Sequence, residues 1–206
     1  MSLIEQYFPD LTDAQKLLFT RLEPIYKEWN LKVNLVSRND IENLYERHVL
    51  HSLAIGKFIR FKNETRIMDI GTGGGFPGIP LAILFPHARF TLVDSIAKKI
   101  KVVEDVIQQL GLQNCVAVCG RAENIDGEFD YVVSRATAPL SDLYRWCRDK
   151  ISKTQKNAVP NGILCLKGGD LSEEIKPFKN RTEVVEISHY FKEPFFETKR
   201  LVFLAV

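Results

Sequence analysis

The sequence feature that most constrains the fold is a run of glycines around position 73. Glycine occupies four of the five positions 71–75, within the run Asp69-Ile-Gly-Thr-Gly-Gly-Gly-Phe-Pro-Gly78. A strand-like run precedes these glycines and a helix-like run follows them. Glycines let a chain turn tightly and let a ligand come close to the backbone. Because an ordinary strand-to-helix turn needs fewer glycines, we predict that this one forms part of a ligand site.

The segments after this turn predict an α/β fold. From residue 65 onward, short β-like runs mostly alternate with helical stretches, which is typical of a parallel sheet covered by helices on both faces. The last two strand-like runs have no helix between them, so we expect a C-terminal antiparallel hairpin at one edge of the sheet. The expected strands are 66–70, 90–94, 115–119, 131–136, 162–167, 183–191 and 198–206, and the expected helices are 79–85, 97–110, 143–151 and 170–178.

The residues before this alternation predict an N-terminal helical cap. Apolar residues recur there at spacings of three and four, which is the pattern of an amphipathic helix. Thr12 and Gln15 are placed to form a capping box at the start of the first helix. A second helical run covers about 41–61. We therefore divide the chain into a cap, residues 1–62, and a ligand-binding domain, residues 63–206, which together form one compact unit.

The composition narrows the class of protein. A chain of 206 residues that is 45% hydrophobic and 26% charged is typical of a globular protein and excludes disordered, collagen-like and coiled-coil classes. No apolar run approaches the roughly 20 residues that span a bilayer, and we expect no secretory signal. The four cysteines fit no zinc spacing and no CxxC pair, so we expect reduced thiols in a cytoplasmic protein. The net charge of +2 identifies no partner by itself.

The spacing of the glycines favours S-adenosylmethionine over a dinucleotide. Gly71, Gly73 and Gly75 give the pattern GxGxG rather than the dinucleotide fingerprint GxGxxG. A carboxylate, Asp69, precedes them, and it would repel a pyrophosphate but attract the ammonium group of an amino acid. The chain contains no Walker lysine, HExxH motif or evident Ser-His-Asp set, so neither an NTPase nor a hydrolase is supported.

Two acidic residues at later strand ends are candidate ligands for a nucleoside. Asp94 closes the second expected strand, where a carboxylate can accept hydrogen bonds from both ribose hydroxyls. The alternative is that Asp94 caps the helix that follows, and one aspartate could do both. Glu123 follows the third expected strand, where the edge of an adenine would lie, but it could equally be an ordinary surface acid.

Two basic residues end the next two expected strands. Arg135 ends the fourth and Lys167 the fifth. Ligands of open α/β sheets bind beyond the carboxyl ends of the strands, so both side chains are placed to touch a cofactor or substrate. The alternative for Arg135 is a surface arginine. His48 and His51 have HxxH spacing, but no acid or cysteine set accompanies them, so we expect no metal site and leave their roles open.

Together these residues resemble the RsmG family, also called the glucose-inhibited division protein B family. Its members are bacterial methyltransferases that act on N7 of a guanine in small-subunit ribosomal RNA. The resemblance covers nearly the whole chain. It rests on Trp29-Asn30, Asn34-Leu35 and His48, on DIGTGGGFPGIPLAI, on LVDS with Lys98, on Arg121 before Glu123, on Ser134-Arg135-Ala136 and on Leu166-Lys167-Gly168.

The resemblance implies a class I methyltransferase fold with S-adenosylmethionine as methyl donor. It implies cofactor contacts at Gly71, Phe76, Ala122, Glu123 and Arg135, to which the residue patterns add Gly73 and Asp94. The residues similar to the family's basic, RNA-side positions are Lys98, Arg121, Lys167 and Arg200. We take Arg135 and Lys167 as the candidate catalytic residues, with Arg135 ordering the cofactor and Lys167 holding a guanine O6 or a phosphate.

The implied chemistry needs no general base, because guanine N7 carries a free lone pair and no proton. Catalysis would then consist mainly of positioning. We expect small-subunit (16S) ribosomal RNA as the partner, free or within the assembling subunit, no membrane contact, and a monomer in the cytoplasm.

Three other functions are weighed against this one. The first alternative is an S-adenosylmethionine-dependent methyltransferase of a small molecule or protein. An NAD-dependent dehydrogenase would show GxGxxG and an acid–base residue. A non-enzymatic nucleic-acid-binding module would not need the glycine turn together with both acids.

Overall fold

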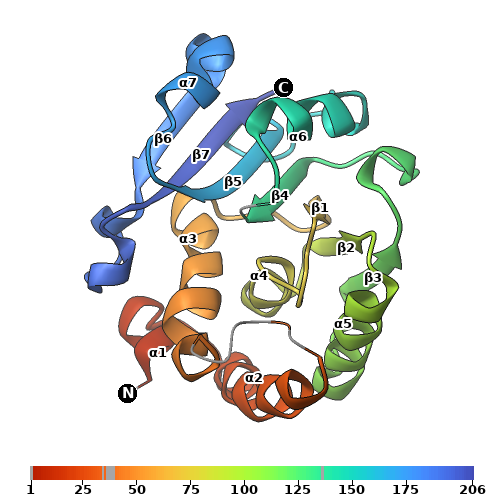
Figure 1. Cartoon of the computed structure of the whole chain (residues 1–206), viewed down its shortest axis with the longest axis vertical. Helices are drawn as coiled ribbons and strands as arrows, with labels where there is room; N and C mark the ends of the chain where they lie inside the picture. The colour runs from red at the N-terminus through yellow and green to blue at the C-terminus, as the bar shows by residue number, and fades with distance from the viewer. Residues whose placement is uncertain (1, 34, 36–39, 136) are drawn as a thin grey trace.

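The sheet at the centre of the protein has the predicted α/β organisation. The computed structural model describes residues 2–33, 35, 40–135 and 137–206, so Asn34 and Ala136 of the motifs above lie outside the described residues. Within that part of the chain, seven strands form one sheet in the order β3-β2-β1-β4-β5-β7-β6 (Figure 1). The strands are β1 (Arg66–Ile70), β2 (Arg89–Asp94), β3 (Cys115–Cys119), β4 (Tyr131–Arg135), β5 (Gly162–Gly168), β6 (Thr182–Glu186) and β7 (Lys199–Ala205).

The pairing of the strands confirms the mostly parallel sheet. β1 pairs in parallel with β2 and β4, and β3 and β5 extend the parallel set on either side. β7 runs antiparallel to both β5 and β6, so the last two strands form the expected hairpin at one edge. The carboxyl ends of β1 to β5 therefore meet at one edge of the sheet, which is where α/β sheets bind ligands.

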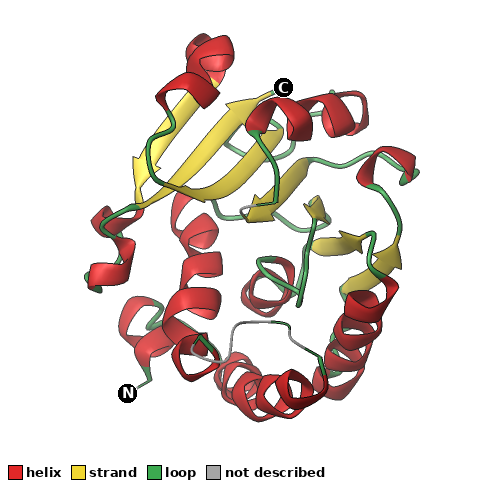
Figure 2. Ribbon diagram, in the orientation of Figure 1, coloured by secondary structure: helices red, strands yellow, loops and turns green. Residues whose placement is uncertain are grey.

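Helices cover both faces of the sheet (Figure 2). Alternate residues of the central strands β1, β4 and β5 belong to different hydrophobic clusters: Ile67 packs with α2 to α5 on one face, and Met68 packs with α6 on the other. This follows from the two-residue period of a strand. The helices are α1 (Leu3–Tyr7), α2 (Asp13–Lys32), α3 (His51–Phe58), α4 (Gly78–Leu84), α5 (Ala97–Leu110), α6 (Leu140–Cys147) and α7 (Ser172–Ile175).

The cap is helical, but it is wound differently from the prediction. α2 starts with the predicted capping box, in which Thr12 and Gln15 each accept a hydrogen bond from the other's backbone N–H. The single helix expected over 41–61 is instead three consecutive segments. These are the 3-10 turn η1 (Ile41–Asn43), the π-helix η2 (Leu44–Leu50) and α3. Wider π turns often occur at functional sites, and this one carries Arg47 and His48.

Three further elements differ from the sequence prediction. The helix expected over 143–151 is α6, which starts at Leu140 and ends at Cys147, followed by the 3-10 turn η4 (Arg148–Lys150). The strand expected over 183–191 ends at Glu186, because the chain leaves the sheet there and buries the Phe191 ring against Tyr7, with ring centroids 4.9 Å apart. The helix expected over 170–178 is the short α7 followed by the 3-10 segment η5 (Lys176–Arg181). A Pro at the second position of η5 leaves that segment without a regular hydrogen-bond donor there.

The cap and the sheet share one hydrophobic core. Buried side chains of α2, α3, α4 and α5 pack in the same cluster as the strand residues. The Tyr26 hydroxyl of α2 donates a 2.6 Å hydrogen bond to the carbonyl of Gly74, and its ring lies 4.9 Å from that of Phe76. The cap is therefore fastened directly to the glycine turn. The division into residues 1–62 and 63–206 stays a prediction.

The four cysteines are free thiols, and most of them are buried. Cys115, Cys147 and Cys165 are buried, Cys119 is exposed, and all four are free thiols. Burial raises the pKa of Cys165 to about 12. Among the described residues, no helix has the length and apolar character to cross a membrane.

Candidate functional site

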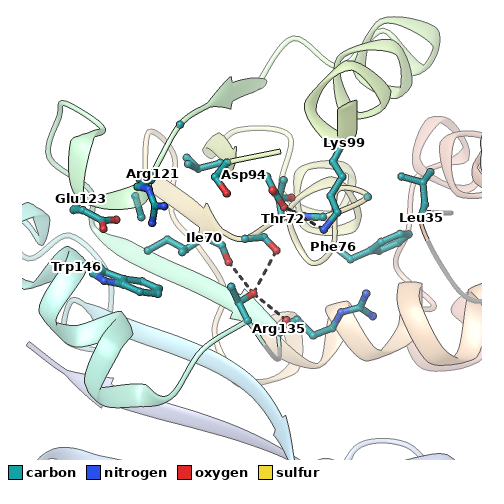
Figure 3. A pocket seen from close by; sticks show the side chains of 18 of the residues that line it. Leu35, Ile70, Thr72, Phe76, Asp94, Lys99, Arg121, Glu123, Arg135 and Trp146 are labelled. Carbon is teal, nitrogen blue, oxygen red and sulfur yellow. Dashed lines mark hydrogen bonds and ion pairs between the residues drawn. The ribbon is translucent and has the colours of Figure 1, made fainter. Parts of the chain in front are cut away.

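A cavity of about 490 Å³ lies beyond the carboxyl ends of β1 to β4 (Figure 3). Its volume falls within the range of about 300–1,000 Å³ that small-molecule sites have. The cap closes one end of it with Leu35 and His48. The cavity is lined by every residue predicted to contact the cofactor, namely Gly71, Gly73, Phe76, Asp94, Ala122, Glu123 and Arg135.

Backbone atoms of the glycine turn line one side of the cavity. Gly71 and Gly73 have φ angles of +67° and +59°, a conformation that side chains disfavour. A Cβ on Gly71 would collide with Thr137, at 2.2 Å from its methyl carbon, whereas a Cβ on Gly73 would meet nothing closer than 3.9 Å. Gly71 is therefore needed for close packing of two loops, and Gly73 leaves space that a ligand can use.

Asp69 has a different role from the one expected of it. Its carboxylate is fully buried and accepts hydrogen bonds from the Thr72 hydroxyl, at 2.6 Å, and the Gly78 N–H, at 2.9 Å. It does not belong to the lining of the cavity, so it does not face a ligand's ammonium group there. Burial raises the pKa of Asp69 to about 7. The residue instead ties the two ends of the glycine turn together.

Asp94 lines the cavity and also braces the turn before α5. One carboxylate oxygen accepts from the Gly73 N–H at 3.0 Å, and the other accepts from the Ile96 N–H at 2.9 Å. Lys99 forms an ion pair with it at 3.8 Å. The N-cap residue of α5 is Ile96, so the alternative of Asp94 as helix cap is wrong. Asp94 is only 7% exposed and lines the cavity.

The segment after β3 forms the end of the cavity farthest from the cap. Ala122 and Glu123 belong to the 3-10 turn η3 (Ala122–Asn124), where Ala122 is buried and Glu123 is exposed. Figure 3 shows Arg121, Glu123 and the ring of Trp146 gathered at this end. A flat aromatic ring beside a carboxylate is a suitable wall for a heterocyclic base, which offers a face for stacking and an amino group for hydrogen bonding.

Arg135 reaches the opposite end of the cavity. Its guanidinium donates to the Arg47 carbonyl at 3.2 Å and lies 2.9 Å from Nδ1 of His48. It also stacks over the ring of Phe76, 5.1 Å from the ring centroid (Figure 3). Burial lowers the pKa of Arg135 to about 10, so the group stays charged at neutral pH. The alternative of a simple surface arginine is wrong, because this side chain joins the cap to β4.

His48 lies in the cap, between Arg135 and Phe76. Its ring centroid is 5.3 Å from that of Phe76. Burial, with a further contribution from the charge of Arg135, lowers the pKa of His48 to about 4, so the ring is neutral at physiological pH. Its Nε2 atom is buried and has no hydrogen-bond partner among the described residues.

The candidate RNA-side residues lie around the cavity rather than together inside it. Arg121 lines the cavity, while Lys98 is exposed outside it. Lys167 lines a separate hollow of about 340 Å³ that shares Thr137 with the cavity. Its ammonium pairs with Glu174 at 2.6 Å and donates to the Ala138 carbonyl at 2.8 Å. Arg200 is the register partner of Lys167 and pairs with Glu186 at 2.8 Å.

Several lining residues carried no signal in the sequence. Trp146 looks like an ordinary member of an amphipathic helix, and Thr137 follows a strand end without any polar pattern. Lys99 rather than its neighbour Lys98 lines the cavity, which depends on where α5 begins. His48 was visible as a histidine, but its contact with Arg135 joins residues 87 positions apart. No group of three or more potential metal ligands occurs among the described residues.

Comparisons with known proteins identify relatives of this chain. A family model described as rRNA small subunit methyltransferase G matches residues 15–202. The Ribosomal RNA small subunit methyltransferase G of Bacteroides thetaiotaomicron is 54% identical over 203 residues, covering 98% of each chain. The protein of the same name from Flavobacterium psychrophilum is 54% identical over 202 residues, covering 98% of this chain and 96% of that one.

Solved structures share the fold at low sequence identity. A precorrin-6y methyltransferase from Geobacter metallireducens has a TM-score of 0.57 at 12% identity, covering 75% of this chain and 86% of that one. Aeropyrum pernix fibrillarin, solved with natively bound S-adenosyl-L-methionine, has a TM-score of 0.52 at 14% identity, covering 77% and 75%. At these identities the similarity concerns the fold alone, and it confirms the predicted class I methyltransferase architecture.

Proposed function

Because the chain belongs to the rRNA small subunit methyltransferase G family, we propose that it transfers a methyl group from S-adenosylmethionine to N7 of a guanine in small-subunit (16S) ribosomal RNA. The protein is an S-adenosylmethionine-dependent methyltransferase. The observation that carries the proposal is the cavity at the carboxyl edge of the sheet. One hollow of ligand size collects all seven residues predicted for the cofactor.

The residues of this cavity fit S-adenosylmethionine. Asp94 offers acceptors for the ribose hydroxyls, since a carboxylate has about four lone-pair sites and two of them are used by the backbone. Glu123 offers an acceptor and Trp146 a stacking face for the adenine. The open space above Gly73 admits the ligand to the backbone. When bound, the cofactor supplies an electrophilic methyl group.

The protein's part in the reaction is to position the reactants. The N7 lone pair of guanine needs no deprotonation, so a general base is not required. Of the described groups that line the cavity, His48 is the one with an ordinary pKa between pH 5 and 8, and burial lowers that pKa to about 4. Arg135 orders the cofactor side. Lys167 holds the guanine O6 or a phosphate from the neighbouring hollow after exchanging its contact with Glu174.

RNA recognition is assigned to four basic residues around the cavity: Lys98, Arg121, Lys167 and Arg200. Cations near a nucleic acid bind phosphates by releasing counterions, so they orient the RNA without reading its sequence. We propose that the cap (residues 1–62) and the catalytic domain (63–206) act as one monomeric unit in the cytoplasm, on either the free RNA or the assembling subunit.

A methylation assay with two substrates tests the proposal. Small-subunit RNA and intact small subunits, both from cells that lack this enzyme, are incubated with the purified protein and isotopically labelled S-adenosylmethionine. We expect the label in N7-methylguanosine after digestion and mass spectrometry. The substrate that is labelled faster identifies free RNA or the particle as the natural partner.

Other results would point to other functions. Label in an exocyclic amine or a ribose oxygen would contradict the proposed chemistry, because those atoms require removal of a proton. Label in neither RNA substrate, together with normal cofactor binding, would favour a methyltransferase of a small molecule or protein.

A further inference from the structure

Building on the proposed function, we propose that His48 is a positioning residue of the cofactor site. Its neutral imidazole holds the Arg135 guanidinium at the cap end of the cavity, where that guanidinium receives the carboxylate of the cofactor's amino acid. Without the cap, Arg135 at the end of β4 would have no residue to fix the position of its guanidinium in the site.

The first observation is the charge of Arg135. The guanidinium is partly buried, enough to lower its pKa to about 10, yet it forms no ion pair with any carboxylate of the described residues. Its neighbours are a carbonyl, an imidazole nitrogen and the face of Phe76. Charges taken out of water are normally paired. The site therefore offers a cation that an incoming anion can neutralise.

The second observation is the tautomer of His48. A guanidinium has donors only, so the 2.9 Å contact with Arg135 requires Nδ1 to accept. A neutral imidazole that accepts at Nδ1 carries its proton on Nε2. That N–H is buried without a partner among the described residues, which is unfavourable for a buried donor. The contact therefore makes Nδ1 the atom that holds Arg135, and the guanidinium has one acceptor oxygen, the Arg47 carbonyl, and no carboxylate partner among the described residues.

The third observation is the polarity of the cavity along its length. The end beyond β3 holds Glu123 beside Arg121 and the middle holds Asp94 paired with Lys99, whereas the cap end carries Arg135 and His48 and no carboxylate among the described lining residues. S-adenosylmethionine has a matching polarity, with donor groups on its nucleoside and a carboxylate on its amino acid. A ligand whose nucleoside lies beside Asp94 and Glu123 therefore directs its amino acid toward the cap.

An RNA phosphate has the same anionic chemistry and is the competing source. We favour the carboxylate because Arg135 and His48 line the same continuous cavity as the predicted nucleoside contacts. Of the candidate RNA-side residues, Lys98 and Lys167 lie outside that cavity, and Arg121 lines it at the end opposite the cap.

Two ligands that differ only in the carboxylate test the inference. Calorimetry without RNA measures the affinities of the full chain for S-adenosylmethionine and for decarboxylated S-adenosylmethionine. We expect the wild-type protein to bind the first about 10- to 100-fold more tightly, the range for losing a hydrogen-bonded charged partner. The ratio of the two affinities is the readout, and it does not depend on turnover.

Three variants separate positioning from general stability. His48→Leu removes both ring nitrogens, and we expect its ratio to fall below about threefold, since Arg135 is no longer held. His48→Asn places an amide oxygen near the position of Nδ1, and we expect its ratio to lie between that of the leucine variant and wild type. His51→Asn is the control, because His51 is a buried histidine one turn away that does not line the cavity. It should keep the wild-type ratio.

The outcomes distinguish this inference from the proposed function. A wild-type protein that binds neither ligand would contradict the proposed function itself. Tight but equal binding of both ligands would overturn only the carboxylate assignment. If His48→Leu loses affinity for both ligands equally, His48 has only a structural role. If the affinity ratio of His48→Asn is no higher than that of His48→Leu, the contact at Nδ1 does not position Arg135. A leucine variant with an unchanged ratio but weakened RNA binding would assign the anion to a phosphate.

Discussion

The two edges of the parallel sheet each hold a cavity, and the one that we propose as the cofactor site is the smaller. The cavity at the amino ends of β1 to β3 has a volume of about 610 Å³, against about 490 Å³ at the carboxyl ends. At the amino edge, Arg66 pairs with Glu128 at 3.1 Å and Arg89 pairs with Glu64 at 2.6 Å. The Asn114 amide there donates to three backbone carbonyls.

The carboxyl edge differs in what its polar groups contact. Arg135 has no carboxylate in ion-pair contact among the described residues, and the Nε2 atom of His48 has no partner there. The turn beside them has a glycine backbone with free space above Gly73. The two edges therefore differ in charge pairing: Arg66 and Arg89 each have a carboxylate partner, although Nε of Arg66 has no hydrogen-bond partner, whereas Arg135 has no carboxylate partner among the described residues. A partly buried cation without a carboxylate, rather than cavity volume, is the basis on which we assign the cofactor site to the carboxyl edge.

The largest expected effect comes from closing the free space at the carboxyl edge. Gly73→Val should lower cofactor affinity by at least about 100-fold, because a β-branched side chain would occupy the ligand's space at a φ of +59°. Calorimetry with S-adenosylhomocysteine measures it. Gly111→Val is the control, since Gly111 has a similar φ of +70° at the end of α5 but does not line the cavity. It should lose stability and keep cofactor affinity. Equal losses in both variants would show that the effect is strain alone.

Removing one acid at each edge compares the two cavities directly. Asp94→Ala should weaken cofactor binding by about 2 kcal/mol, or about 30-fold, through lost charge-assisted hydrogen bonds to the ribose. Glu64→Ala at the amino edge should leave that affinity within about twofold, because the exposed pair with Arg89 contributes little. Unchanged cofactor affinity in a folded Asp94 variant would reject the ribose assignment.

Salt dependence distinguishes the two edges in RNA binding. Alanine at Lys98, Arg121 and Lys167 together should make the negative slope of log affinity against log salt shallower by about 2, at about 0.7 per phosphate contact on single strands. Alanine at Lys62, Arg66 and Arg89 removes the same charge from the amino edge and should leave the slope nearly unchanged. Filter binding over a salt series measures both. A larger change in the second variant would move the RNA surface to the amino edge.

The smallest expected effect is that of pH on the methyl-transfer rate. The lowered pKa of His48, about 4, keeps this residue neutral above about pH 5, so it exchanges no proton between pH 6.5 and 8.5. Single-turnover rates with saturating RNA and cofactor should vary less than about threefold over that range. Asp69, with a raised pKa of about 7, is the group to control for. Asp69→Asn should show the same flat profile, and a tenfold rise per pH unit in both proteins would indicate a required base.

The sequence predicted the strand ends well because their pattern is local. Gly71, Asp94, Glu123 and Arg135 each follow a recognisable strand run, and the parallel connection brings such ends to one edge. All four line the cavity. The mostly parallel pairing and the hairpin followed from the same alternation, whereas the order of the strands in the sheet was not predicted.

The contacts that join the cap to this edge could not be predicted in the same way. The pairing of His48 with Arg135, the place of Trp146 beside Glu123 and the shielding of Lys167 by Glu174 depend on packing between distant segments. Asp69 was misjudged for the same reason, since its sequence position beside the glycines does not reveal that the turn folds over it. Individual side-chain partners require the three-dimensional structure.

The bond between the Tyr26 hydroxyl and the Gly74 carbonyl has a consequence for local opening of the protein. Amide protons exchange with solvent when a segment opens, and segments that share a core open together. The Tyr26–Gly74 hydrogen bond and the Tyr26–Phe76 contact join α2 to the glycine turn. The amides of both segments should therefore have similar protection factors in hydrogen exchange. Cofactor binding at the turn should then slow exchange in α2, a helix that for the most part does not touch the ligand.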